Sequence, residues 1–146
     1  MLNNHYKDIL SILSEKKAKF LLVGAYAMAV HGYPRSTMDI DLLVMPDPEN
    51  AALVLSALAE FGAPVGDLSI NDLQKEGLIF QIGVAPCRID ILTSIDGIKF
   101  EDAYKHSELV DIEGISVHVL SIPDLITNKL ATGRTKDLAD AELLED

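Results

Sequence analysis

Several features that mark specialised protein classes are scarce or absent in this sequence. A single cysteine, Cys87, excludes a disulfide framework within the chain and fits a reducing cytoplasm. No apolar run approaches the roughly 18 to 20 residues that a membrane-spanning helix requires. The N-terminal residues MLNNHYKDIL also lack the basic and apolar regions of a secretory signal. We therefore expect a cytoplasmic protein without a membrane partner.

Basic residues are also scarce. The chain has 12 Lys and Arg against 23 Asp and Glu, a formal net charge of −11. Extended DNA or RNA binding depends on basic patches, so this balance argues against it and leaves room only for a local contact, such as with an RNA end. With 146 residues, of which 49% are hydrophobic and 24% charged, we expect one globular domain spanning residues 1–146.

The order of apolar segments predicts an α/β (α+β) fold, a mixed β-sheet flanked by helices in a single domain. Glycine, proline and polar clusters separate the segments, and Ser121 is a suitable cap for the helix that follows it. The predicted strands are 20–23, 39–44, 78–84, 88–92, 109–112 and 115–120, with the third and fourth joined near Ala85-Pro86. The predicted helices are 3–16, 25–30, 49–60, 100–106, 123–132 and 135–144, with a further short one at 68–75.

The stretch from Lys19 to Val44 is the most informative part of the chain. An apolar strand ends at Gly24, a short helix follows, and the next strand carries Asp39 and Asp41. Side chains alternate along a strand, so both carboxylates face the same way and repel each other unless a cation lies between them. A divalent metal with oxygen ligands would meet that need. The alternative is a pair of exposed carboxylates without a partner.

Gly24 adds a second element. A glycine lets the backbone approach a phosphate closely, and the N-terminus of the following helix adds its dipole. A plain strand-to-helix turn is the simpler alternative. Asp90 lies between Ile89 and Ile91 on a later strand, so a third carboxylate joins the set on one strand face.

These residues resemble the DNA polymerase β-type nucleotidyltransferase superfamily. Its signature is a hydrophobic strand, Gly-Gly or Gly-Ser, a short spacer, Asp-x-Asp on the next strand, and a third carboxylate on a later strand. Here the matching parts are Val23, Gly24-Ala25, Asp39-Ile40-Asp41 and Asp90. The stretch GAYAMAVHGYPRSTMDIDLLV is most similar to a small bacterial branch with minimal nucleotidyltransferases and AbiEii-like toxin proteins.

The resemblance implies a metal-dependent transferase. Two Mg²⁺ ions, with Mn²⁺ as an alternative, would be held by Asp39, Asp41 and Asp90. Asp39 and Asp41 would bind the nucleotide-associated ion and share the second, and Asp90 would bind the second and help to deprotonate the acceptor hydroxyl. Ala25 departs from the usual Gly or Ser, because alanine keeps the backbone N–H but offers no hydroxyl to a phosphate oxygen.

Further residues are candidates for nucleotide binding. Arg35 could clamp a phosphate or pair with a site aspartate, and Thr37 could bind nucleotide or only shape the loop. The branch carries a later helix resembling NKLATGRTKDLAD, which makes Lys129 a candidate ligand of the triphosphate and Asp137 a matching site position. The alternative for Lys129 is an ordinary surface lysine. Ordinary helix ion pairs, Arg134 with Asp137 and Lys136 with Asp140, are the alternative for the other charged residues of this helix.

Two other residues are expected to be structural. His31 is predicted to hold the turn after the first short helix by a hydrogen bond. Cys87 is predicted to pack within its strand, with a reactive thiol as the less favoured reading.

The sequence thus supports two functional hypotheses. The first is a transferase that moves a nucleoside monophosphate from an NTP to an acceptor on a tRNA end or a protein, in a setting that includes toxin–antitoxin systems. The second is a non-catalytic nucleotide-binding module, or one subunit of a two-protein complex, that retains the same fold. The sequence leaves the oligomeric state open.

Overall fold

The computed structural model of the chain describes residues 2–33, 39–84 and 87–145. A six-stranded mixed sheet with strand order β3-β4-β2-β1-β6-β5 forms its centre, which confirms the predicted fold class. The strands are β1 Phe20–Val23, β2 Ile40–Val44, β3 Ile79–Ile82, β4 Ile89–Leu92, β5 Glu108–Ile112 and β6 Ile115–Val119. The helices are α1 Asn4–Glu15, α2 Gly24–Val30, α3 Pro48–Phe61, η1 Asp72–Gln74, α4 Phe100–His106, α5 Ile122–Thr132 and α6 Thr135–Glu145.

Strand β2 lies at the centre of the sheet. It pairs antiparallel with β1, which sets Val23 opposite Asp41. It pairs parallel with β4, which sets Asp41 beside Asp90. The strands predicted at 109–112 and 115–120 form, and as β5 and β6 they pair antiparallel in a hairpin that turns at Glu113-Gly114.

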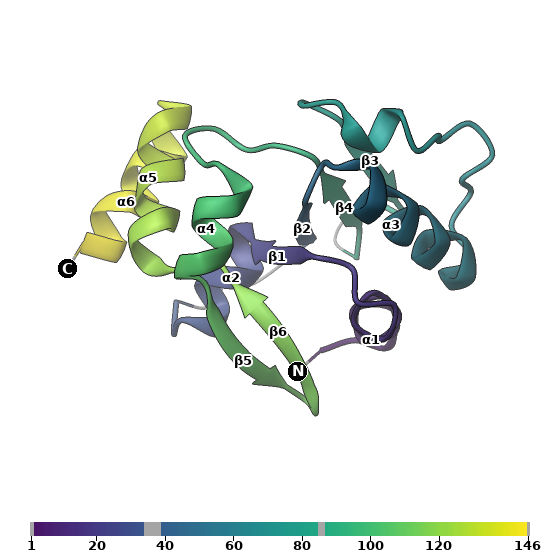
Figure 1. The fold of residues 1–146 in the computed structure, drawn as a ribbon. Coiled ribbons are helices and arrows are strands. Elements are labelled where there is room, and N and C mark those ends of the chain that lie inside the picture. Colours follow the sequence, from purple (N-terminus) through teal and green to yellow (C-terminus); the bar gives the residue numbers. More distant parts are fainter. Residues whose placement is uncertain (1, 34–38, 85–86, 146) are drawn as a thin grey trace.

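Helices cover the sheet on both sides (Figure 1). In the picture α1 and α3 lie together on one side, and α4, α5 and α6 on the other. Helix α1 buries Ile9, Leu10 and Leu13, which recur at helical spacing along one stripe. Ile40 and Leu42 of β2 are fully buried on the face opposite Asp41. No helix in the described ranges is long and apolar enough to cross a membrane.

Polar side chains fix the ends of several helices. Asn3 accepts a hydrogen bond from the backbone N–H of Tyr6 at 2.9 Å, and Ser121 caps α5, as predicted, by accepting from the Asp124 N–H at 3.3 Å. The buried Asn50 accepts from the Lys19 N–H and donates to the carbonyls of Lys19 and Met45, so it ties α3 to the strand ends.

The helix predicted for residues 68–75 is mostly absent. Only the single 3₁₀ turn η1 forms there. The Ser69 hydroxyl accepts from the Asp72 N–H at 3.1 Å, and Asp72 accepts from the Ser69 N–H at 3.0 Å. These local side-chain bonds satisfy the backbone in a way that competes with a longer helix.

Candidate active site

Carboxylates from neighbouring strands meet on one face of the sheet. Asp41 and Asp90 are register partners on β2 and β4, so their side chains lie next to each other. Asp39 directly precedes β2 and points to the same side by strand alternation. Asp90 is buried, whereas Asp39 and Asp41 are partly exposed. The structure thus brings together the three aspartates that the sequence predicted as a site.

Arg88 neutralises part of this charge. Its guanidinium Nε lies 2.9 Å from Asp90 Oδ1, and its Nη2 lies 3.2 Å from Asp39 Oδ2. The Arg88 backbone N–H also donates to Asp39 Oδ1 at 3.0 Å. Asp39 and Asp90 are therefore joined by a cation that the chain supplies itself.

Asp41 has no such direct partner among the described residues. Burial, the negative charge of Asp90 and a hydrogen bond with Asp90 raise its pKa from 3.8 to about 7, and Asp39 adds to the rise. The positive charge of Arg88 opposes the shift but does not cancel it. Asp41 is thus a carboxylate that would gain strongly from an added cation.

Gly24 lies directly against Asp41. A Cβ atom at Gly24 would come within 2.4 Å of Asp41 Oδ2, and the residue has φ +69°. Because of this close contact and the left-handed backbone, any residue larger than glycine at position 24 would be energetically costly. Gly24, which follows β1 and begins α2, therefore allows the backbone to lie directly against the Asp41 carboxylate.

The donor set has the chemistry of a Mg²⁺ site. Mg²⁺ takes oxygen ligands, and among the described residues the three carboxylates share a single guanidinium, that of Arg88. As the side chains stand, no group of three acidic, His or Cys residues in the described ranges is arranged to hold a metal ion. Asp39 and Asp90 would both have to release the Arg88 guanidinium to join Asp41 as ligands.

Lys129 belongs to a second charged cluster between α5 and α6. Its ammonium lies 3.2 Å from Asp137 Oδ1 and 3.3 Å from Asp140 Oδ2. Asp137 also accepts from Arg134 Nε and from the Thr132 hydroxyl, both at 2.7 Å. These hydrogen bonds and the Lys129 charge outweigh the effect of burial and lower the pKa of Asp137. The ion pair of Arg134 with Asp137, considered from the sequence, is confirmed. Lys129 is not the exposed surface lysine of the other alternative, because its side chain is only 12% exposed and pairs with Asp137 and Asp140.

The other predicted residues have varied surroundings. His31 has its Nε2 2.9 Å from the Leu120 carbonyl, the kind of hydrogen bond expected of a structural residue. Ala25 is half-buried in the first turn of α2. Cys87 is exposed and precedes β4, so the prediction that it packs within a strand is wrong. Arg35 and Thr37, and the Ala85-Pro86 junction, lie outside the described residues.

Sequence reasoning assigned no role to Arg88. A signal was present, because Arg88 and Asp90 stand two residues apart at the start of a strand and so share a face. The contact with Asp39 depends on the pairing of β2 with β4, which the sequence does not reveal.

Comparisons with known proteins agree with this geometry. Residues 2–144 match a family described as nucleotidyltransferases of unknown function, DUF6036. The crystal structure of a candidate nucleotidyltransferase from Thermotoga maritima shares the fold, with a TM-score of 0.62 at 18% identity over 99% of this chain and 93% of that one. No curated protein matches in sequence. Since the family match spans nearly the whole chain, this protein belongs to the DUF6036 nucleotidyltransferase family.

Proposed function

We propose that the chain transfers a nucleoside monophosphate from an NTP to an acceptor hydroxyl on a protein or a tRNA end, and that it depends on Mg²⁺, with Mn²⁺ as an alternative. The observation that carries this proposal is the register pairing of Asp41 with Asp90 directly beside Gly24. Two adjacent carboxylates next to a close backbone approach suit a triphosphate and its cations better than a structural role does.

In the proposed reaction the acceptor oxygen attacks the α-phosphorus. The bond from that phosphorus to the bridging oxygen breaks, and pyrophosphate leaves. Bound divalent ions would neutralise charge on the attacking and leaving oxygens. Asp39, Asp41 and Asp90 would hold these ions, and Asp90 would take the proton from the hydroxyl.

The remaining candidates would bind the nucleotide. The backbone at Gly24 and Ala25 would contact phosphate oxygens at the N-terminal end of α2. Arg35, Thr37 and Lys129 would contribute further contacts, and Asp137 would orient Lys129 through their ion pair. To contact the nucleotide, the Lys129 ammonium would have to leave one of its aspartate partners and bind a phosphate instead.

Transfer can be tested with labelled nucleotides. The protein is incubated with each α-labelled NTP, Mg²⁺ and cell extract, and label is followed into protein and RNA fractions. We expect label in one of these fractions and none with Asp41→Asn. Equal transfer by wild type and Asp41→Asn, or no labelled acceptor with any nucleotide, would overturn the proposal.

The second candidate is a non-catalytic nucleotide-binding module or partner subunit, including one half of a toxin–antitoxin pair. The Arg88 guanidinium among the carboxylates favours it, because Asp39 and Asp90 are already paired. Ala25 favours it as well, since it lacks the hydroxyl of the usual serine. Calorimetry separates the two: Mg²⁺-dependent NTP binding without turnover in the presence of extract supports the module.

A further inference from the structure

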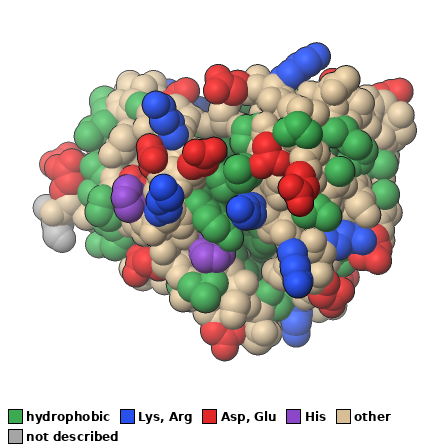
Figure 2. Space-filling model, viewed as in Figure 1, with side chains coloured by type: hydrophobic (Ala, Val, Ile, Leu, Met, Phe, Trp, Pro, Cys, Tyr) green, Lys and Arg blue, Asp and Glu red, His purple; other side chains and the backbone are tan. Residues whose placement is uncertain are grey.

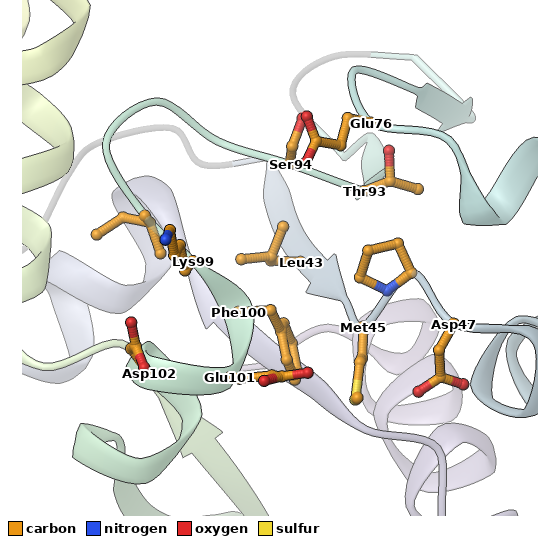
Figure 3. A pocket seen from close by; sticks show the side chains of 12 residues that line it. Leu43, Met45, Asp47, Glu76, Thr93, Ser94, Lys99, Phe100, Glu101 and Asp102 are labelled. Atoms are coloured by element: carbon orange, nitrogen blue, oxygen red, sulfur yellow. The ribbon is translucent and has the colours of Figure 1, made fainter.

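A pocket of about 340 Å³ opens at the other end of β2 from Asp39 (Figure 3). It lies where the parallel strands β2 and β4 end, between those strand ends and α4. Cavities of roughly 300 to 1,000 Å³ are typical of small-molecule sites. Asp39, Asp41 and Asp90 are not among its lining residues, so the pocket shares no residue with the carboxylate cluster.

The inner wall of the pocket is apolar. Leu43 lies at its centre in Figure 3, with Met45 and Phe100 next to it. Leu43 follows Asp41 by two residues on the same face of β2, roughly 7 Å along the strand. Phe100, at the start of α4, is buried and closes one side. Such a wall favours the methylene or ring carbons of a ligand over water.

Carboxylates surround this wall. Figure 3 shows them on several sides of Leu43, and Figure 2, drawn from the side of Figure 1, shows acidic side chains beside apolar ones on this face of the molecule. The four acidic lining residues are Asp47, Glu76, Glu101 and Asp102. Asp47 is engaged in capping α3, where it accepts from the Asn50 N–H at 2.7 Å.

The other three carboxylates are not neutralised by the protein. Within the described ranges, Glu76, Glu101 and Asp102 form no hydrogen bond or ion pair. Glu101 and Asp102 gain some stabilisation from the first turn of α4, but both remain exposed. Among the residues that the structure describes, Lys99 is the one basic residue that lines this pocket. Four acidic groups against one basic group give the pocket a strong preference for cations.

A divalent metal is a poor candidate for this charge. In the part of the chain that the structure describes, no three acidic, His or Cys side chains converge on a common point. The carboxylates are spread around an apolar surface instead. That separation suits a ligand with positive groups at the ends of a carbon chain or ring.

We propose that this pocket binds a small organic cation, with ammonium or guanidinium groups on a short apolar body. The body packs on Leu43, Met45 and Phe100. Its charged ends face Glu76 on one side and Glu101 on the other. Binding here does not require the chain to transfer nucleotides, because the pocket shares no residue with the carboxylate cluster.

The proposal can be tested with a simple probe series on the full chain. The probes are 1,5-diaminopentane, the neutral 1-pentanol and the anionic pentanoate, each titrated at low salt and followed by amide NMR shifts. We expect the diamine alone to shift Ser94, Lys99 and Phe100. In Glu76→Gln/Glu101→Gln, we expect its affinity to fall at least tenfold. The control Glu15→Gln/Glu142→Gln removes the same charge from exposed sites on α1 and α6, and its affinity should change less than twofold.

Three results would overturn the proposal. Equal binding of 1-pentanol would show that charge plays no part. Equal weakening in the control variant would mean that the diamine responds only to the net charge of −11. Shifts confined to residues around Asp41 and Asp90 would mean that the cation prefers the carboxylate cluster. All four substituted glutamates are exposed, so loss of folding is not expected to obscure the comparison.

Discussion

Arg88 holds Asp39 through both its backbone and its side chain. Its N–H donates to Asp39 Oδ1 at 3.0 Å, and its Nη2 lies 3.2 Å from Asp39 Oδ2. The same guanidinium reaches Asp90, so one side chain spans the start of β2 and the body of β4. A bound cation would compete with Arg88 for the same oxygens, which leads to the first prediction.

Arg88→Ala should make the protein more dependent on Mg²⁺ for stability. Without metal, the variant is expected to unfold at a lower temperature than wild type, because a charged, hydrogen-bonded partner of two carboxylates is gone. Added Mg²⁺ should raise its melting temperature more than that of wild type. Thermal unfolding in EDTA and in a Mg²⁺ series measures both effects, with the exposed Lys7→Ala as control. If Mg²⁺ raises the melting temperature of the variant no more than that of wild type, Arg88 and the metal do not compete for the same carboxylates.

Gly24→Ala should damage the cluster more than other glycine substitutions do. Gly24 and Gly62 both have positive φ. A Cβ at Gly24 would lie 2.4 Å from Asp41 Oδ2, whereas a Cβ at Gly62 would meet no described atom within 4 Å. Gly62→Ala is therefore expected to cost about 1 kcal/mol from backbone strain alone. Gly24→Ala should cost at least about 2 kcal/mol and also weaken Mg²⁺-dependent NTP binding. Urea unfolding and calorimetry on both variants test this. An equal loss of unfolding free energy in the two variants would contradict a specific clash between residue 24 and Asp41.

The stability of the metal-free protein should fall as pH rises from about 4 to 8. The pKa of Asp41 is about 7 in the fold against an ordinary 3.8, so the folded state binds the proton more tightly. Below the ordinary value both states are protonated. Above 7 the folded state must hold a partly desolvated charge beside the carboxylates of Asp90 and Asp39, a cost that Arg88 only partly offsets. In Asp41→Asn, the unfolding free energy should fall by about 1 to 3 kcal/mol less over this pH range than in wild type, after allowing for solvent screening. Urea unfolding at pH 5 and pH 8 in EDTA is the measurement. Parallel declines in the two proteins would exclude Asp41 as the source.

Lys129→Met should destabilise the pairing of α5 with α6. It leaves the buried Asp137 and Asp140 without the ammonium between them, and loss of one partner in a buried pair costs about 3 kcal/mol. Lys129→Met/Asp140→Asn should recover part of that loss, because one of the two negative charges that faced the ammonium is removed. Chemical unfolding tests the stability, and NTP titration of the folded variants tests the proposed phosphate contact separately. Unchanged stability with weaker NTP binding would show that Lys129 serves the nucleotide and not the fold.

Much of the fold was predictable because the local signals agree. Apolar runs bounded by glycine or proline predicted the strands, and Ser121 with Pro123 predicted the start of α5. The helix predicted for residues 68–75 was mostly wrong, because Ser69 and Asp72 hydrogen-bond to each other's backbone. The spacing of apolar residues does not reveal such bonds. The three aspartates could be grouped from the sequence, because alternation puts each on one face of its strand.

The cations were harder to predict than the carboxylates. Arg88 acts on Asp39 only because β4 pairs in parallel with β2, although the two strands are far apart in the sequence. Lys129 could equally have been free or paired, and only the packing of α6 against α5 decides that it contacts Asp137 and Asp140. The partners of long side chains at helix and strand ends depend on which elements pack next to them. The sequence spacing of such residues therefore predicts their ion pairs poorly.

The position of β2 between β1 and β4 has a consequence for how the carboxylate cluster can respond to ligands. Its backbone amides and carbonyls are hydrogen-bonded on both edges, so they belong to the part of a protein that exchanges hydrogen slowest and opens last. Asp41 and Asp90 are therefore attached to a backbone that does not readily adjust. Arg88 precedes β4 and has a long side chain, so it can move away while the strands stay in register. Adaptation to a cation or a triphosphate would then take place through side-chain rotation against a fixed frame.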